Sequence, residues 1–591
     1  MPSARCSRAA LARAIRASVA PQVVLVLLLA APLLPPPVLA RVLNRHRLHP
    51  LSAAAGAALY GADDTVLGDV GGGGEGGKAA GREARVYVAE GSGTEAPPAS
   101  LDPPSEMFDV CSFPGAINFT MSATLIGTTW RGWGTSLAWE GNYIGGLARA
   151  HMGVLLDAVF HRTKGLGLNI VRYNIGGGLS AQHSPQFQRD QQTRLKAMPG
   201  YWPAEKAAYD WSADQRQRNV LFGARARGAN IFEAFANSPP WWMTVSGDVA
   251  GAAGRNRTNL QRKYEGKFAE YLATVVERFA KDPAWNLTFD TLEPFNEPLE
   301  GFWNAGNTQE GCNLDVAAMG RVLTHTAKAL KAKKLRTRVA AFDSWVESTA
   351  RALNSVRGMR SAARINVHSY MDPAPPSKDP ALYTGQVYLK VRDMAKRLGK
   401  EVWVSESGHL GRGGHPYDLS LYVARTVIEA VNMLHASAFV YWMAYDPDIG
   451  WAIVRFPWTY PAGYSGPIPE PVLSKRYYMF KMLTSLVKQG SRPLVMPPKC
   501  RHGMAGFYNA ADRTVSVFVV NQKPKDAQLS VSLAGFRINV NGRTKAVVRR
   551  TSWSQDMAEV VLSQGKAVAT VTIQGRSFVS LHFTNVQRSF P

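Results

Sequence analysis

The stretch "LTFDTLEPFNEP", residues 287–298, runs from an apolar segment into two glutamates that are each followed by a proline. Its apolar lead-in predicts a buried strand, and Pro298 ends that strand because proline lacks the N–H that a sheet requires. Glu297 is therefore expected at the carboxyl end of the strand. Glu293, four residues earlier, is expected deeper inside the sheet, and Glu300 in the loop that follows.

Seven similar apolar runs flank this stretch between Trp130 and Asp446, and helical patterns separate them. The helical patterns repeat apolar residues at spacings of three and four. Eight strand–helix units over about 320 residues are typical of a (β/α)₈ TIM barrel. A doubly wound parallel sheet is the alternative, since a count of strands does not show that the sheet closes. The seven runs span 130–139, 168–176, 229–238, 337–345, 364–370, 401–408 and 436–445.

A different pattern begins after the last helical segment. Residues 486–591 hold short alternating runs separated by Gly, Asn and Asp, which predicts an antiparallel β-sandwich. Residues 106–128 also have strand character and are expected to join that sandwich. The barrel is assigned to residues 129–485, so we expect one catalytic barrel with an appended, mainly C-terminal β-sandwich.

The amino terminus has the composition of a targeting signal. Four arginines precede an apolar run at 23–34, and "PVLA" ends on a small residue, which predicts a signal peptide at residues 1–40. A signal anchor is the alternative, and without it we expect no stable membrane insertion. Residues 41–105 are rich in Gly and Pro, which predicts a disordered linker that is dispensable for folding.

The signal predicts a secreted protein, extracellular or in the cell wall, or one held in the endomembrane lumen by a signal anchor. Three N-x-[ST] sequons fit a secretory route and a glycoprotein. Three cysteines remain after the signal; they allow at most one disulfide, and their spacing matches no metal motif. The sequons are at Asn118, Asn256 and Asn286, and the cysteines are Cys111, Cys312 and Cys500.

The formal net charge is +24, and residues 1–104 hold only 10 Lys and Arg against 8 Asp and Glu. Nearly all of the positive excess therefore belongs to the rest of the chain. Basic surface attracts polyanions. Beside a secretory signal, an acidic extracellular polysaccharide is a better expectation than nucleic acid, and high Arg usage without functional meaning is the alternative.

A second glutamate follows the seventh apolar run. "WVSESG", residues 403–408, places Glu406 109 residues after Glu297. In a TIM barrel both carboxylates would lie at the carboxyl ends of strands, on one rim. Glycoside hydrolysis needs such a pair, because one carboxyl protonates the departing oxygen while the other attacks the anomeric carbon or activates water. The alternatives are a loop carboxylate or helix cap for Glu297 and a surface turn for Glu406.

Eight motifs in order make the sequence resemble glycoside hydrolase family 30, a clan A family, from about Met107 to the end. The resemblance implies a (β/α)₈ barrel flanked by a β-sandwich, and retention of anomeric configuration. It also implies Glu297 as acid/base and Glu406 as nucleophile, with their carboxyls about 5 Å apart. The motifs are "GWGTSLAW" (132–139), "VRYNIGGG" (171–178), "NSPPWWM" (237–243), "EPFNEP" (293–298), "QEGC" (309–312), "NVHSY" (366–370), "WVSESG" (403–408) and "VYW" (440–442).

Within the family, the "WGTSL" opening looks most like the endo-β-1,6-galactanases. The sequence departs from them at Trp139 and Glu140, where a Trp pair is usual, and this change could alter a sugar subsite. It also has "VKQG" at 487–490 in place of an Ile-Arg-Pro-Gly run, which should affect only packing. The glycines at 176–178 lack the Lys-Ser/Thr of a phosphate loop and are expected to leave room for substrate.

Several polar and aromatic residues at strand ends are candidates for substrate binding. Arg172 and Tyr370 could orient ionised Glu406, and Asn296 is placed to bind the sugar 2-OH. His368 could equally be a satisfied core residue, and buried packing is the alternative for the tryptophans. Trp442 is favoured among them because it ends strand eight. The full set is Arg172, Asn296, His368, Tyr370, Trp442, Trp133 and Trp241.

Together these features predict a secreted retaining glycoside hydrolase, an endo-β-1,6-galactanase acting on galactan or arabinogalactan side chains. Another specificity of the same family (β-1,6-glucanase, xylanase or glucosylceramidase) is the first alternative, and a non-catalytic glycan-binding wall protein is the second. The expected partner is a galactan-type polysaccharide, neutral or acidic, and not nucleic acid. We expect a monomer with no metal or organic cofactor.

Overall fold

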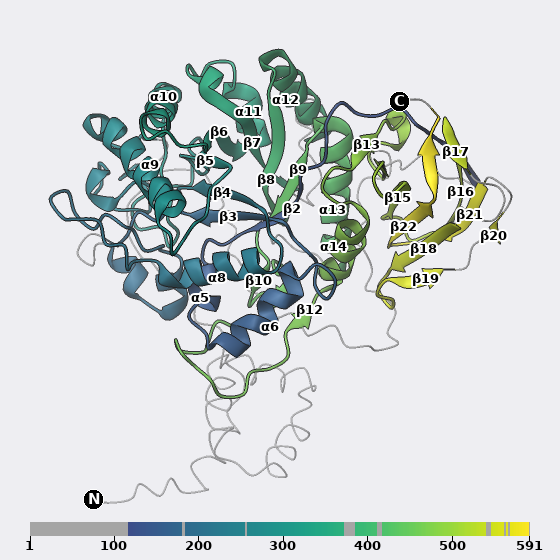
Figure 1. Ribbon diagram of the computed structural model, residues 1–591, viewed down its shortest axis with the longest axis horizontal. Coiled ribbons are helices and arrows are strands. Elements are labelled where there is room, and N and C mark those ends of the chain that lie inside the picture. Colours follow the sequence, from purple (N-terminus) through teal and green to yellow (C-terminus); the bar gives the residue numbers. More distant parts are fainter. Residues whose placement is uncertain are drawn as a thin grey trace, which may run out of the picture. The chain divides into compact units, whose positions relative to one another are not determined.

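The computed structural model (Figure 1) describes most of the chain that follows residue 115. The predicted signal at 1–40, the linker at 41–105, Cys111 and the sequon at Asn256 lie outside it. The described residues are 116–179, 184–254, 257–371, 384–409, 416–538, 545–560, 563–564 and 568–589.

Eight parallel strands form a closed ring in chain order, which confirms the (β/α)₈ barrel and excludes the open doubly wound sheet. Each predicted apolar run holds one of the strands. Most strand residues are buried, as expected where helices cover the outside and side chains fill the inside. The strands are β2 (Gly132–Ser136), β3 (Ile170–Asn174), β4 (Ile231–Phe235), β5 (Thr291–Glu293), β6 (Arg338–Trp345), β7 (Ala362–Met371), β8 (Glu401–His409) and β9 (Ala438–Tyr441).

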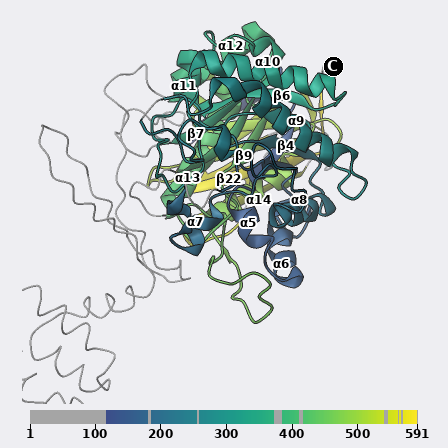
Figure 2. The same ribbon diagram turned by 90° about the vertical axis from the view of Figure 1, so that its left-hand side faces the viewer.

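Helices surround the barrel strands, as Figure 2 shows for β4, β6, β7 and β9. Helix α9 illustrates why they form: Phe268, Leu272, Val275 and Phe279 recur at spacings of three and four and are all buried. The helices are α5 (Glu140–Ile144), α6 (Arg149–Phe160), α7 (Gln191–Leu195), α8 (Gln215–Ala226), α9 (Glu265–Lys281), α10 (Val316–Ala332), α11 (Val346–Ala352), α12 (Thr384–Leu398), α13 (Pro416–Glu429) and α14 (Lys475–Leu486). A π-helical turn, Ala430–Leu434, follows α13.

The C-terminal region forms two main sheets around a separate apolar core. One sheet has the order β13-β14-β15-β22-β18-β19 and the other β1-β16-β21-β20. All pairings within them are antiparallel except β1 with β16, which is parallel. The strands are β1 (Ala116–Ser122), β13 (Arg492–Leu494), β14 (Met504–Asn509), β15 (Thr514–Asn521), β16 (Ala527–Ala534), β18 (Lys545–Thr551), β19 (Ala558–Val560), β20 (Ser563–Gln564), β21 (Val568–Ile573) and β22 (Ser577–Thr584).

Two small strand groups were not predicted. One is the pair β17 (Phe536–Ile538) and β23 (Val586–Arg588). The other is a three-stranded sheet of β10 (Tyr445–Asp446), β11 (Val454–Arg455) and β12 (Val472–Leu473), in the segment between β9 and α14. Two-residue strands are too short to leave a periodic signal in a sequence.

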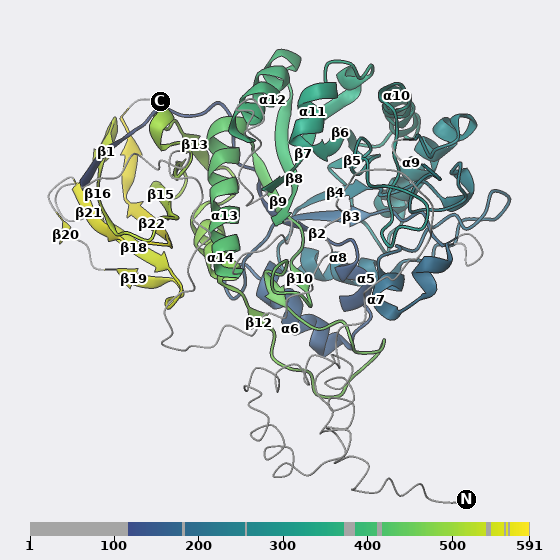
Figure 3. The same ribbon diagram turned by 180° about the vertical axis from the view of Figure 1, so that it is seen from behind.

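Helices α13 and α14 lie between the barrel strands and the sandwich, as seen from both sides in Figures 1 and 3. The Tyr417 hydroxyl of α13 donates to the carbonyl of Arg576, and the Arg576 side chain pairs with Asp418. These contacts join the sandwich to the outside of the barrel.

Trp133 was predicted to bind substrate, and the structure places it in the core instead. It lies near the amino end of β2, only 2% exposed, and its indole N–H donates to the carbonyl of Val487 at 2.9 Å. Its ring packs against Trp130 and Phe480. Trp133 is therefore a core residue, because the amino ends of barrel strands face away from the catalytic rim.

The structure tests part of the predictions about the glycosylation sequons, the disulfide and membrane insertion. Asn118 and Asn286 are exposed. Cys500 is disulfide-bonded, whereas Cys312 is a free, buried thiol. None of the described helices has the length and hydropathy of a membrane span.

Candidate active site

Glu297 follows β5 at the carboxyl rim of the barrel, in a tightly held backbone segment. Its φ angle is +51°, a left-handed conformation that costs free energy for a residue other than glycine. The Glu297 N–H donates to the carbonyl of Asp343 at 2.6 Å, and the Trp303 indole donates to the Glu297 carbonyl at 2.9 Å. These contacts stabilise a backbone geometry that fixes where the carboxylate points.

The Glu297 carboxyl has two partners from neighbouring strands. Its Oε1 accepts a hydrogen bond from the indole N–H of Trp345 at 2.6 Å and lies 3.0 Å from His368 Nδ1. Trp345 ends β6 and was not predicted. Glu300, in the following loop, accepts a 3.3 Å hydrogen bond from the Trp345 backbone N–H, so it supports the tryptophan rather than the reacting centre.

Glu406 projects from β8, and its carboxylate is held by the guanidinium of Arg172 and the hydroxyl of Tyr370. Its Oε2 accepts from Arg172 Nη1 at 3.0 Å, and its Oε1 accepts from the Tyr370 hydroxyl. Arg172 comes from the middle of β3 and Tyr370 from the carboxyl end of β7. The structure thus places both residues where the sequence predicted them, against one carboxylate.

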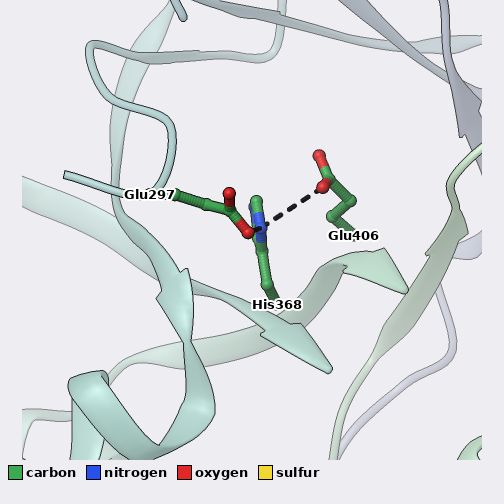
Figure 4. A group of neighbouring side chains, drawn as sticks. All are labelled: Glu297, His368 and Glu406. Atoms are coloured by element: carbon green, nitrogen blue, oxygen red, sulfur yellow. Dashed lines mark hydrogen bonds and ion pairs between the residues drawn. The ribbon is translucent and has the colours of Figure 1, made fainter. Parts of the chain in front are cut away.

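His368 lies between the two glutamates (Figure 4). Its Nδ1 is 3.0 Å from Glu297 Oε1 and 3.4 Å from Glu406 Oε1, and the facing atoms of all three residues lie within 4.8 Å of one another. Carboxyls about 5–5.5 Å apart are characteristic of retaining enzymes, because no water fits between the second carboxylate and the anomeric carbon. The spacing therefore suits direct attack by Glu406.

A β-bulge produces this alignment. Val367 pairs with Val404, but the next residue, His368, pairs with Glu406, so Ser405 is passed over. Because strand side chains alternate between the two faces, the extra residue turns Glu406 to the same side as His368. A regular register would have set Ser405 opposite the histidine instead.

The buried charges shift the proton affinities of this group. Burial alone would lower the pKa of His368, but the carboxylates Glu406 and Asp343 raise it well above its usual value. Burial raises the pKa of Glu406, while His368 and Arg172 limit that rise. The raised pKa favours the protonated imidazolium, whose Nδ1 can donate to Glu297 Oε1.

Asp343 connects several parts of the site, and it is not among the residues predicted from the sequence. Its carboxylate pairs with Arg172, accepts from Ser405 Oγ at 2.6 Å and lies 3.1 Å from His368 Nε2. Burial would raise the pKa of Asp343, but Arg172 and His368 lower it, which keeps the carboxylate ionised. An acidic residue within the apolar run "VAAFDSW" was the available signal.

A second layer of buried charge lies deeper in the barrel. Glu233 of β4 accepts from Arg172 Nε at 3.2 Å and also pairs with Arg364. Asn366 donates to Glu233 at 3.1 Å and to Glu293 at 3.4 Å. Burial and the charge of Asp343 raise the pKa of Glu293 well above its usual value. Glu293 thus lies in the barrel interior, as its position in the strand predicted.

Asn296 and Trp442 lie beside the glutamates. Asn296 is 7% exposed, and its side-chain oxygen has no hydrogen-bond partner among the described residues. The backbone N–H of Trp442 donates to the carbonyl of Ser407, and the Trp442 ring meets the Trp139 ring edge to face at 4.9 Å. Contact of either residue with a bound sugar stays a prediction.

The structure bears on two expectations about the rim. Glu140 is fully buried and accepts from the Tyr445 N–H at 2.8 Å, so its own side chain does not contact a sugar. Gly176 and Gly177 leave no open space, because a Cβ at either would collide with Met198 or Ser238. These two glycines let neighbouring loops pack closely, whereas Gly178 lines a cavity of about 510 Å³ among those loops.

Trp241 is separate from the carboxylate pair. It follows β4 in a short 3₁₀ turn and lines a cavity formed by loops on the same face of the barrel. Nearby, Glu310 of the "QEGC" motif accepts from the Gly177 N–H at 2.6 Å, Ser238 Oγ at 2.8 Å and the Met198 N–H at 3.2 Å. This buried carboxylate holds three loops together.

Comparison with known proteins agrees with this geometry. The family model for O-glycosyl hydrolase family 30 matches residues 117–449. An endo-β-1,6-galactanase from Hypocrea rufa is 32% identical over 415 residues, covering 66% of this chain and 78% of that protein. An exo-β-1,6-galactobiohydrolase from Bifidobacterium longum subsp. longum is 26% identical over 420 residues, covering 53% of this chain but only 26% of that protein.

Solved structures share the fold at low sequence identity. The catalytic domain of a family 30 xylanase C from Talaromyces cellulolyticus superimposes with a TM-score of 0.58 at 18% identity, covering 79% of this chain and all of that one. An endo-β-1,6-glucanase gives a TM-score of 0.54 at 16% identity, covering 79% and 93%. The chain therefore belongs to glycoside hydrolase family 30, a family of retaining glycoside hydrolases.

Proposed function

We propose that the protein is an endo-acting hydrolase of β-1,6-linked galactan, such as the side chains of arabinogalactan. The observation that carries the galactan assignment is the 32% identity over 415 residues to a relative named endo-β-1,6-galactanase. The close Glu297–His368–Glu406 group supports the double-displacement chemistry.

In the first step, Glu406 attacks the anomeric carbon while Glu297 gives its proton to the glycosidic oxygen. A glycosyl ester forms at Glu406, the bond to the leaving sugar breaks, and Glu297 becomes a carboxylate. Arg172 and the Tyr370 hydroxyl hold Glu406 in position before attack. Arg172 also favours the ionised carboxylate, which is the nucleophilic form.

In the second step, ionised Glu297 takes a proton from water, and the water oxygen attacks the anomeric carbon. The ester breaks, Glu406 returns as a carboxylate, and Glu297 is protonated again. Trp345 and His368 donate to Glu297 and stabilise its charge in the intermediate. Asn296 lies next to the acid/base and is assigned to the sugar 2-OH.

We propose that the protein acts outside the cytoplasm, as a secreted or wall-associated glycoprotein. The signal-like residues 1–40 support this location. Exposure of the sequons at Asn118 and Asn286 is also consistent with it, since an oligosaccharide can be added only where the asparagine is accessible.

The proposed specificity is tested by a screen of hydrolysis products. We expect oligosaccharides to be released from β-1,6-galactan and not from β-1,6-glucan, xylan or glucosylceramide. A Glu406→Gln protein prepared in the same way is the control, because any products it yields come from a contaminating enzyme. Faster hydrolysis of one of the other three substrates would replace the galactan assignment with that specificity.

The positive charge leads to a prediction about salt. If the charge attracts an acidic galactan, kcat/KM on that substrate should fall several-fold as salt rises from about 0.02 to 0.3 M, since the Debye length shortens. Neutral galactan of similar length is the matched control, and its kcat/KM should barely change. Equal salt responses on the two substrates would mean that the charge has no part in substrate capture.

A further inference from the structure

Three segments that lead from a barrel helix into the next strand are strongly basic. They run from α10 into β6 (residues 331–338), from α11 into β7 (353–361) and from α12 into β8 (396–400). Together these segments hold ten Lys and Arg residues and no Asp or Glu. Their Lys and Arg side chains form the basic face.

The three segments lie side by side at the amino ends of adjacent strands. Strand β7 pairs with β6 on one side and with β8 on the other, and Figures 1 and 3 show α10, α11 and α12 next to one another. The ammonium of Lys400 donates to the Arg360 carbonyl at 3.2 Å, which joins the second and third segments. The 3₁₀ turn Met359–Ser361 contacts α10, which joins the second segment to the first. The basic side chains therefore gather on one surface.

Most of the charge on the basic face is not balanced by a carboxylate. Among the described residues, Lys333 is the one member that forms an ion pair, with Glu270 at 2.7 Å and Glu277 at 2.9 Å. The Glu401 carboxylate, at the start of β8, pairs with Arg131 instead. Like charges that lie together repel one another, and a bound polyanion would remove that repulsion.

The helix ends explain only part of this charge. Lys331, Lys396 and Arg397 lie in the last turns of α10 and α12, where a cation stabilises the helix dipole. Six other members lie beyond those turns and are exposed, except for one that is half-buried. Four of the six are arginines, whose planar guanidinium binds a carboxylate or a similar oxyanion through two parallel hydrogen bonds. The six are Lys334, Arg336, Arg338, Arg357, Arg360 and the half-buried Lys400.

The basic face lies at the opposite end of the barrel from the catalytic glutamates. Arg338 begins β6, whereas Trp345, which donates to the Glu297 carboxyl, ends the same strand. At the usual rise per residue, the eight residues of β6 span roughly 23 Å. A polymer held on the basic face therefore leaves the catalytic rim open.

We propose that the basic face binds an acidic polysaccharide bearing carboxylate or sulfate groups, and so anchors the enzyme to an extracellular matrix while the opposite rim hydrolyses its substrate. The positive charge and the exposed arginines match such a polymer, which need not be the chain that is cleaved. The choice of a polysaccharide over nucleic acid rests on the proposed location outside the cytoplasm. It does not depend on the galactan assignment.

The anchor is tested by removing four of its arginines together, in the variant Arg336→Gln, Arg338→Gln, Arg357→Gln, Arg360→Gln. Binding to immobilised polygalacturonate, which carries carboxylates, and to a sulfated galactan is measured by biolayer interferometry. At about 0.05 M salt, where screening is weak, the wild-type protein should bind at least one of the two polymers, and the variant should bind it about tenfold or more weakly. The polymer bound more tightly identifies the preferred anionic group.

A second fourfold variant removes the same charge elsewhere and is the matched control. It replaces exposed basic residues in the C-terminal region, and its Kd for the same polymer should stay within about twofold of wild type. Equal losses in the two variants, no loss in the arginine variant, or equally tight wild-type binding to double-stranded DNA would overturn the inference. The control substitutions are Lys499→Gln, Lys525→Gln, Arg537→Gln and Lys545→Gln.

Activity measurements show which face the polymer occupies. Saturating acidic polymer should leave the kcat/KM of the wild-type protein on neutral β-1,6-galacto-oligosaccharides unchanged, because polymer and substrate bind at opposite ends of the barrel. Both fourfold variants should keep the wild-type kcat and melting temperature. Competitive inhibition by the polymer would place it at the catalytic rim and overturn the anchor. Failure of the wild-type protein to hydrolyse any of these oligosaccharides would overturn the galactan assignment alone, since the binding measurements do not use catalysis.

Discussion

Replacing Glu406 by Gln is expected to lower kcat on β-1,6-galactan by several orders of magnitude, on the order of 10⁴-fold or more. An amide does not attack the anomeric carbon, so the glycosyl ester cannot form. Gln has the same size, its carbonyl oxygen can accept from Arg172 and its amide N–H can donate to the Tyr370 oxygen, so the fold should be retained. Initial rates on galactan, together with the melting temperature, measure the two effects separately.

Glu401→Gln is the control for this substitution. Glu401 begins the same strand, β8, at the opposite end of the barrel, where it pairs with Arg131 and accepts from Ser437. It should keep a near-normal kcat. Turnover of Glu406→Gln within about tenfold of the wild-type protein would remove Glu406 from the reaction.

Glu297→Ala should have an effect that depends on the leaving group. On galactan, whose leaving sugar needs a proton, the loss of the acid should lower kcat by about 10²–10⁴-fold. On an aryl galactoside with a good leaving group, the glycosyl-enzyme should still form, because that group departs without protonation. The second step should then be slow, since no base activates water.

Azide distinguishes this mechanism from a loss of folding. Azide attacks the anomeric carbon without needing a base, so it should raise the turnover of the aryl galactoside by Glu297→Ala and yield the β-galactosyl azide. Glu406→Gln, which forms no ester, should not give that product. Equal losses on galactan and on the aryl substrate, without azide rescue, would show that Glu297 is not the acid/base.

The barrel and its two glutamates were predictable because they depend on local sequence. Apolar runs separated by amphipathic helices set the strand order, and Pro298 marks where β5 has ended. Position at a strand end then suffices to bring Glu297 and Glu406 to one rim. These features need no knowledge of side-chain contacts.

The contacts around the glutamates depend on register and were not predictable. Nothing in "WVSESG" indicates that Ser405 is passed over in the pairing with β7, yet that bulge aligns His368 with Glu406. Trp345 and Asp343 belong to β6, far from both glutamates in sequence, and only strand adjacency brings them close. Trp133 was misassigned because a motif does not show which end of its strand faces the rim.

The position of His368 has a consequence for how charge moves during turnover. In the free enzyme the negative charge is on Glu406, 3.4 Å from Nδ1; in the intermediate it is on Glu297, 3.0 Å from the same nitrogen. The negative charge is thus on Glu406 before the first step and on Glu297 after it, and the His368 side chain need not move. The net charge of the buried pocket therefore stays constant through the cycle. A low-dielectric interior strongly opposes any change in net charge. The free enzyme, with Glu297 protonated, and the glycosyl-enzyme, with Glu297 ionised, can therefore interconvert without a compensating ion. His368 need not exchange a proton with solvent in either step.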